Sequence, residues 1–100
     1  MTRFLITYHG SGMPSDPALM EQAKTAFATW ASEAGDPIVD PGAPVHMVSQ
    51  ASSGSPTDPA EIGGYSIIQA ESLDAATAVL QSHPYVARGG TLQINQIIEV

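Results

Sequence analysis

The amino-acid sequence predicts a single α+β domain whose elements follow the order strand, helix, strand, strand, helix, strand. Three observations support this order: two amphipathic segments with helical spacing, three strand-like segments rich in β-branched or aromatic residues, and a weaker strand candidate in the proline-rich middle. With 100 residues, the chain is long enough for one two-layer core and too short for two independent ones. Residues 1–100 are therefore interpreted as one domain.

The first strand is predicted over residues 3–9, "RFLITYH", which "GSGMPS" ends. A helix follows, with Asp16 as its N-cap, Pro17 at its first position and Gly35 as its stop. Its apolar face is predicted from residues that recur at helical spacing: Leu19, Ala23, Phe27, Trp30, Ala31 and Ala34.

The next segment, "DPIVDPGAPVHMVSQ", contains prolines that exclude a helix. Its end, residues 45–49, resembles a short strand, and the prolines nearby favour an edge position. The polar, turn-rich stretch 49–61 is expected to form an exposed loop.

A second strong strand is predicted over residues 64–70. Ser72 then caps a helix that Pro84 ends, with an apolar face of Leu73, Ala76, Val79 and Leu80. The last strand is predicted in "TLQINQIIEV", residues 91–100, where apolar and polar residues alternate.

This order predicts a ferredoxin-like βαββαβ fold, a four-stranded antiparallel sheet with both helices on one face. The other face would carry Ile97 together with either Ile67 or Ile68. Because a monomer would expose this apolar surface to water, the sequence favours a homodimer that buries the helix-free face.

Composition narrows the class of partner. Three basic residues against ten acidic ones give a formal charge of −7, which disfavours nucleic acid and anionic membrane surfaces. The chain has no cysteine, and no apolar run approaches the ~20 residues of a membrane span. No signal-peptide pattern is visible, so a cytoplasmic location is expected.

Cofactor and metal sites are also disfavoured. "GSG" after the first strand lacks a phosphate-loop pattern, and no serine lies in a G-x-S-x-G elbow. The histidines at 9, 46 and 83 have no local metal-site spacing. We therefore predict no nucleotide cofactor and no metal.

The segment "GGYSIIQAESLDAATAVLQSHPYVARGGTLQINQIIEV", with "FLITYHG" and "GDPIVDPGAP", resembles the YCII-related (DGPF-type) family. The resemblance implies a dimeric α/β barrel. Some members pair a helical histidine with an aspartate before the proline of a "DPY" turn, for acid and base work on small aromatic or chlorinated substrates. In this chain those places fall near Lys24 and at His83, so the dyad is not present in that form.

Three residues remain as catalytic candidates. His83 could donate or accept a proton, although a histidine that ends a helix is commonly explained by the helix dipole. His9, at a strand end, could share one cleft with His83, or simply bind a nearby carbonyl. Asp40 could orient a histidine, but Asp before Pro-Gly is also typical of turns. A His83→Ala variant is expected to fold nearly normally.

The aromatic residues have competing interpretations as well. Trp30 is predicted to belong to the core, whereas Tyr65 and Tyr85 could each lie at the core boundary or point a hydroxyl group into a pocket. His46 has no functional assignment. Two hypotheses follow: a small isomerase- or lyase-type enzyme that moves protons on an organic molecule, or a non-catalytic module that binds or senses a small ligand.

Overall fold

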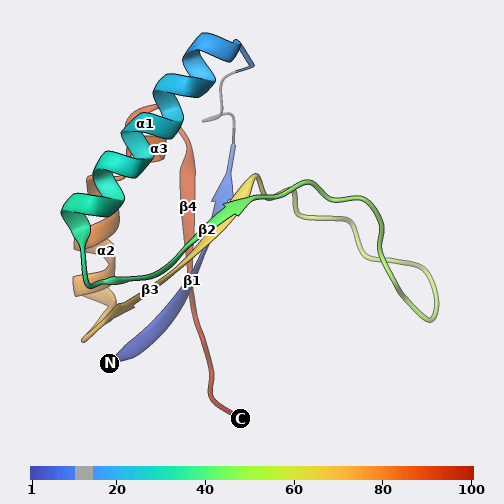
Figure 1. Ribbon diagram of the computed structural model, residues 1–100. Helices are drawn as coiled ribbons and strands as arrows, with labels where there is room; N and C mark the ends of the chain where they lie inside the picture. The colour runs from blue at the N-terminus through green and yellow to red at the C-terminus, as the bar shows by residue number, and fades with distance from the viewer. Residues whose placement is uncertain (11–14) are drawn as a thin grey trace.

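The structure, a computed structural model, describes residues 1–10 and 15–100, so most of the "GSG" segment lies outside the described residues. The elements are β1 (Thr2–His9), α1 (Pro17–Ala34), β2 (Ile38–Pro44), β3 (Gly64–Ala70), α2 (Leu73–Gln81), α3 (Pro84–Ala87) and β4 (Thr91–Gln96). The strands form one sheet in the order β2-β3-β1-β4, and the helices cover one of its faces (Figure 1).

All three strand pairs are antiparallel, which confirms the ferredoxin-like α+β fold. Alternation along the two central strands divides their side chains between the faces: Ile6 and Ile68 are fully buried under the helices, whereas Leu5 and Ile67 are opposite each other on the helix-free face. The core under the helices consists of Phe4, Ile6, Trp30, Ile68, Ala70, Ala76 and Leu80.

The helix boundaries follow the predicted capping residues. The Asp16 carboxylate accepts a hydrogen bond from the Ala18 amide at 2.8 Å, and the Ser72 hydroxyl accepts one from Ala75 at 3.1 Å. Gly35 ends α1 with a φ of 68°, a left-handed conformation that glycine adopts without steric cost.

The buried apolar face of each helix is shorter than predicted, because it does not include the first turn. Leu19 is 49% exposed and Leu73 is 59% exposed, although both were expected on the apolar faces. Each lies in the first turn of its helix, where the residues near the cap pack least against the sheet.

The predicted strand at 45–49 is wrong, because the edge strand occupies Ile38–Pro44 instead. Its pairing with β3 is interrupted by register shifts on both sides of Asp40. An irregular edge strand tolerates proline because one side of its backbone needs no partner strand. Residues 45–63 form no helix or strand and extend away from the sheet as a long arm (Figure 1).

Two features of the C-terminal part were not predicted. Pro84 ends the α2 segment, but it also begins the short helix α3, in which His83 is the N-cap. Strand β4 stops at Gln96, so residues 97–100 lie beyond the sheet rather than inside a longer strand. Ile97 still donates its amide to the Arg3 carbonyl at 2.9 Å, which keeps it aligned with β1.

Candidate functional site

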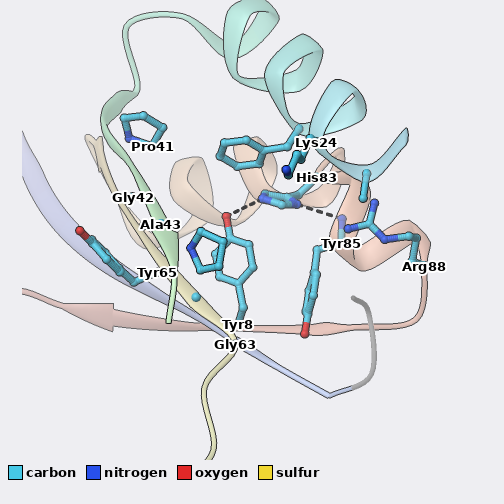
Figure 2. Close-up of a pocket in the computed structure, with 14 residues that line it drawn as sticks. Tyr8, Lys24, Pro41, Gly42, Ala43, Gly63, Tyr65, His83, Tyr85 and Arg88 are labelled. Carbon is cyan, nitrogen blue, oxygen red and sulfur yellow. Dashed lines mark hydrogen bonds between the residues drawn. The ribbon is translucent and has the colours of Figure 1, made fainter. Parts of the chain in front are cut away.

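A cavity of about 230 Å³ opens between the first half of α1, the edge strand β2, the start of β3 and helix α3 (Figure 2). Tyr8, from the end of β1, contributes to its floor, and His83 and Tyr85 line the side formed by α3. The cavity therefore lies where the end of β1 and the start of β3 meet under the helices.

His83 is 1% exposed and forms hydrogen bonds through both ring nitrogens. Its Nδ1 accepts a hydrogen bond from the Tyr85 amide at 3.0 Å and so caps α3. A neutral imidazole whose Nδ1 accepts carries its proton on Nε2, so Nε2 donates to the Tyr8 hydroxyl oxygen across 2.7 Å (Figure 2). The hydrogen-bond pattern thus assigns the tautomer of His83.

The hydrogen bonds continue from Tyr8 into the sheet edge. The Ser66 hydroxyl donates to the Pro41 carbonyl at 2.8 Å, so the Tyr8 hydroxyl donates to Ser66 Oγ, also at 2.8 Å. One directed chain of donors therefore connects α3, β1, β3 and β2. Because each hydroxyl in this chain has a defined partner, the Tyr8 oxygen is held in position at the cavity.

Burial shifts the proton affinities of both groups. Loss of water around the imidazole, with a smaller contribution from the Arg88 charge, lowers the pKa of His83 to about 4. Burial also raises the pKa of Tyr8, with a smaller raising effect from Tyr85, whereas the hydrogen bond with Ser66 acts in the opposite direction. At neutral pH, His83 is uncharged and Tyr8 keeps its proton.

Aromatic rings enclose His83. The Trp30 ring lies 4.3 Å from the imidazole, centroid to centroid, and the Phe27 ring lies 5.6 Å from it. Trp30 is 6% exposed, which confirms its prediction as a core residue, and its indole N–H donates to Ser82 Oγ at 3.1 Å. From this packing we expect His83→Ala to be destabilised rather than to fold nearly normally, because the change would leave a void and an unpaired Tyr85 amide.

His9 and His83 do not share a cleft. The His9 ring bonds to Thr7 Oγ1 at 2.8 Å, on the sheet face opposite Tyr8, because neighbouring strand residues point to opposite sides. Asp40 lies in β2, where its carboxylate accepts a hydrogen bond from the Gly42 amide at 2.8 Å and forms a local turn. Only His83, of the three candidates, lines the cavity. The catalytic assignment of His9 and Asp40 stays a prediction.

Sequence reasoning missed Tyr8 and Ser66 as site residues. Tyr8 and Ser66 both lie inside predicted strands, residues 3–9 and 64–70, with no motif around them. For Tyr85, the sequence left open a ring at the core boundary or a hydroxyl group in a pocket. In the structure its ring is 3% exposed and lines the cavity, and its hydroxyl donates to the Gly10 carbonyl at 3.1 Å. The remaining signal was the "SHPYVARGG" turn itself, which supplies His83, Tyr85 and Arg88.

The described residues contain no cluster of three or more histidine or acidic side chains arranged to hold a metal ion. Among the same residues, no helix combines the length and the apolar character that crossing a membrane requires.

Comparison with known proteins identifies the fold. No family model matches the chain, and no curated protein matches its sequence. Among solved structures, the chain is similar to 5-chloro-2-hydroxyhydroquinone dehydrochlorinase from Burkholderia phenoliruptrix, in complex with 2,5-dihydroxybenzoquinone. The match has a TM-score of 0.55 and 20% sequence identity, and covers 91% of this chain and 90% of the other. The match supports the ferredoxin-like α+β fold of the chain.

Proposed function

We propose that the protein is a small-molecule enzyme of the isomerase or lyase type, which transfers a proton to and from a ligand in the cavity. The observation that carries this proposal is the Tyr8 hydroxyl, held at the cavity by the donor chain through His83 and Ser66. The similar fold of a dehydrochlorinase that binds a small quinone adds support for a small organic ligand.

Tyr8 is the group assigned to carry the proton. It gives its phenol proton to a ligand atom and becomes a phenolate, which then removes a proton from a second ligand atom and returns to its starting state. His83 Nε2–H already points at the phenol oxygen, and Ser66 can turn its hydroxyl from the Pro41 carbonyl to the same oxygen. Two donors aimed at a transient oxyanion lower the energy of the charged state.

His83 acts in this scheme as a positioning residue. Its Nδ1 lone pair is engaged by a backbone amide and its Nε2 carries a proton, so it has no free basic atom at neutral pH. The hypothesis that His83 is itself the base is therefore replaced by one in which it donates to Tyr8. His9 and Asp40 have no role in this scheme, because neither lines the cavity.

The non-catalytic alternative, a module that binds a small ligand, also has a specific observation in its favour. Among the described residues that line the cavity there is no aspartate or glutamate, and both His83 nitrogens serve structural hydrogen bonds. A binding module requires only the apolar walls and the polar groups that orient a ligand.

Hydrogen exchange into a bound ligand separates these two functions. Using 2,5-dihydroxybenzoquinone and a panel of small enones and lactones in D₂O, we expect the native protein to catalyse deuterium incorporation at ligand carbon, followed by NMR. Tyr8→Phe removes only the hydroxyl, and we expect exchange to slow by about 10²–10⁴-fold, the usual contribution of a general acid or base. Binding of ligand without catalysed exchange by the native protein would establish the alternative.

Two substitutions at His83 test its positioning role. Asn can replace Nδ1 as the cap of α3 but is too short to reach Tyr8, whereas Gln can present an amide N–H toward Tyr8 but does not replace the cap. We expect His83→Gln to retain more exchange activity than His83→Asn, and His83→Asn to be the more stable of the two. The opposite order in activity would contradict the proposed donor role.

We further propose that two copies of the chain associate through the helix-free face of the sheet, and that the protein is located in the cytoplasm. Leu5 and Ile67 face each other at the centre of this face, and Ile97 continues it beside Arg3. These residues are the apolar surface that an isolated chain would leave in contact with water.

A further inference from the structure

We infer that the cavity binds a molecule of about one ring that carries a carboxylate, and that Lys24 and Arg88 bind the carboxylate at the cavity mouth. This inference deepens the proposed function and rests on it only in taking the same cavity as the ligand site. It rests on three independent features: the distribution of charge, the placement of the two cations, and the apolar interior.

The distribution of charge is uneven. The chain has three lysine and arginine residues and ten aspartate and glutamate residues. Two of the three cations, Lys24 and Arg88, line this cavity, while the third, Arg3, lies on β1 and pairs with Gln69 of β3. No acidic residue lines the cavity among the described residues. In a chain of net charge −7, the cavity mouth is a local positive region.

The two cations come from separate elements and are held differently. Arg88 follows α3, and its guanidinium carbon lies 5.9 Å from the centroid of the Tyr85 ring, a cation–π arrangement that keeps it beside the cavity. Lys24 lies on α1 and lines the same cavity. A ligand anion between them could contact both.

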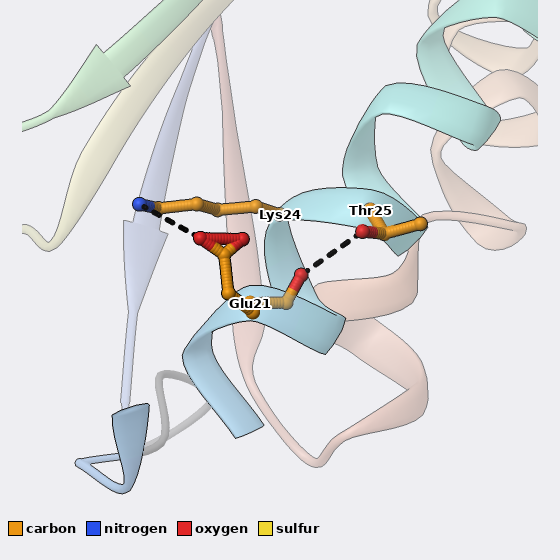
Figure 3. Close-up of polar contacts among 3 residues, drawn as sticks. All are labelled: Glu21, Lys24 and Thr25. Atoms are coloured by element: carbon orange, nitrogen blue, oxygen red, sulfur yellow. Dashed lines mark hydrogen bonds and ion pairs between the residues drawn. The ribbon is translucent and has the colours of Figure 1, made fainter. Parts of the chain in front are cut away.

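Among the residues that the structure describes, Lys24 pairs with Glu21, and the pair is weak. The Lys24 Nζ pairs with the Glu21 carboxylate (Figure 3), at a distance of 4.0 Å. Both side chains are largely exposed, at 68% and 74%. Exposed pairs of this kind contribute little to stability, so Lys24 can leave Glu21 for a ligand carboxylate at little cost. Glu21 itself is held in α1, where its carbonyl accepts a hydrogen bond from Thr25 at 3.1 Å.

The interior behind the cations is suited to a ring. Phe27, Tyr8 and Tyr85 contribute aromatic surface, and the last two rings lie 5.0 Å apart. Pro41 and the backbone of Gly42 complete the wall at the edge strand. The cavity volume of about 230 Å³ is below the ~300–1,000 Å³ that is usual for ligand pockets, which suits a small ligand of about one substituted ring.

A matched pair of probes tests the carboxylate directly. We would titrate the native protein with 4-hydroxybenzoate and with 4-hydroxybenzamide, which have the same shape but differ in charge, and measure affinity by calorimetry or NMR at pH 7. We expect the carboxylate to bind at least tenfold more tightly, and its advantage to shrink at high salt because exposed cations are screened.

Substitutions then assign the effect to residues. Lys24→Gln and Arg88→Gln should each weaken binding of 4-hydroxybenzoate several-fold, and the double variant should bind both probes equally. Arg3→Gln removes the same charge outside the cavity and should leave both affinities nearly unchanged. Lys24 is exposed on α1, so Lys24→Gln is expected to fold normally and provides the decisive variant if Arg88→Gln is unstable.

The inference fails if the two probes bind with equal affinity or if neither binds. It also fails if Arg3→Gln weakens the binding of 4-hydroxybenzoate as much as Lys24→Gln or Arg88→Gln does. The proposed function fails by a different result. If 4-hydroxybenzoate binds in a manner that depends on Lys24 and Arg88 but no ligand exchanges deuterium, the ligand class stands and the enzyme proposal fails. If a neutral ligand exchanges deuterium without dependence on Lys24 or Arg88, the enzyme proposal stands and this inference fails.

Discussion

His83 donates its Nε2 proton to the hydroxyl oxygen of Tyr8 across 2.7 Å, although the two residues are 75 positions apart in the chain. The same imidazole caps α3 through Nδ1, so one side chain stabilises a helix and holds a tyrosine hydroxyl at the cavity. The buried position that makes both contacts possible also lowers the pKa of His83 to about 4, because burial removes the water that would stabilise the charged imidazole, with a smaller contribution from the Arg88 charge.

The first prediction concerns stability against pH. The pKa of His83 falls from 6.5 to about 4 on folding, so between these values the unfolded chain binds a proton that the folded chain lacks. The part of the unfolding free energy that depends on neutral His83 is therefore fully present above pH 6.5 and decreases as the pH falls toward 4. The contribution is on the order of 3 kcal/mol, to be measured by urea unfolding at a series of pH values.

The control for this measurement is His83→Asn, which keeps a cap for α3 but cannot titrate. The acidic residues and the other two histidines change the unfolding free energy of the native protein and of the variant alike. The difference between the two plots of unfolding free energy against pH therefore gives the contribution of His83. Parallel curves for the two proteins between pH 4 and 6.5 would contradict the assigned pKa.

The second prediction separates two roles of glycine near α3. A Cβ at Gly90 would overlap the Cε2 and Cδ2 atoms of Tyr85, and that ring cannot retreat easily because it is buried beside Tyr8. We expect Gly90→Ala to cost about 1–3 kcal/mol or more of unfolding free energy, and Gly90→Val to cost more still. Thermal or urea unfolding measures the loss.

Two further glycines serve as controls. Gly89 has a φ of +90°, but no atom lies within 4 Å of the place that a Cβ would occupy, so Gly89→Ala should show the cost of backbone conformation alone. Gly54 has neither a positive φ nor a close neighbour, so Gly54→Ala should change stability by no more than about 0.5 kcal/mol. If Gly90→Ala lowers the unfolding free energy no more than Gly54→Ala does, the contact between the added Cβ and the Tyr85 ring does not destabilise the fold, and the prediction is wrong.

The third prediction tests association through the helix-free face. We expect the native protein to sediment as a dimer at micromolar concentration, and Ile97→Asp to dissociate it, because an unpaired charge in the interface costs several kcal/mol. Ile98→Asp is the matched control, since Ile98 is 68% exposed and directly follows Ile97, which is 39% exposed. A native protein that sediments as a monomer would exclude this dimer, and equal effects of the two variants would place the interface elsewhere.

Local sequence signals determined the order and most boundaries of the elements. Asp16 and Ser72 accept amide hydrogen bonds from residues only two or three positions away, and Gly35 ends its helix by its own backbone conformation, so each acts independently of the rest of the fold. Strand β3 was predicted with its observed bounds because its residues carry a strong β preference. These local choices, together with the right-handed crossover rule, suffice to predict the ferredoxin-like topology, although not the bounds of its edge strand.

Tertiary structure alone decided the edge strand and the site. Strand β2 forms at Ile38–Pro44 against its own proline content because β3 offers a partner edge, and Gly42, with a φ of +76°, lets the two backbones approach closely. Whether a histidine faces solvent or core depends on what packs over it, and α1 covers His83 but not His9. The link from His83 through Tyr8 to Ser66 joins residues from three elements, and such long-range contacts leave no spacing in the sequence by which they could be recognised.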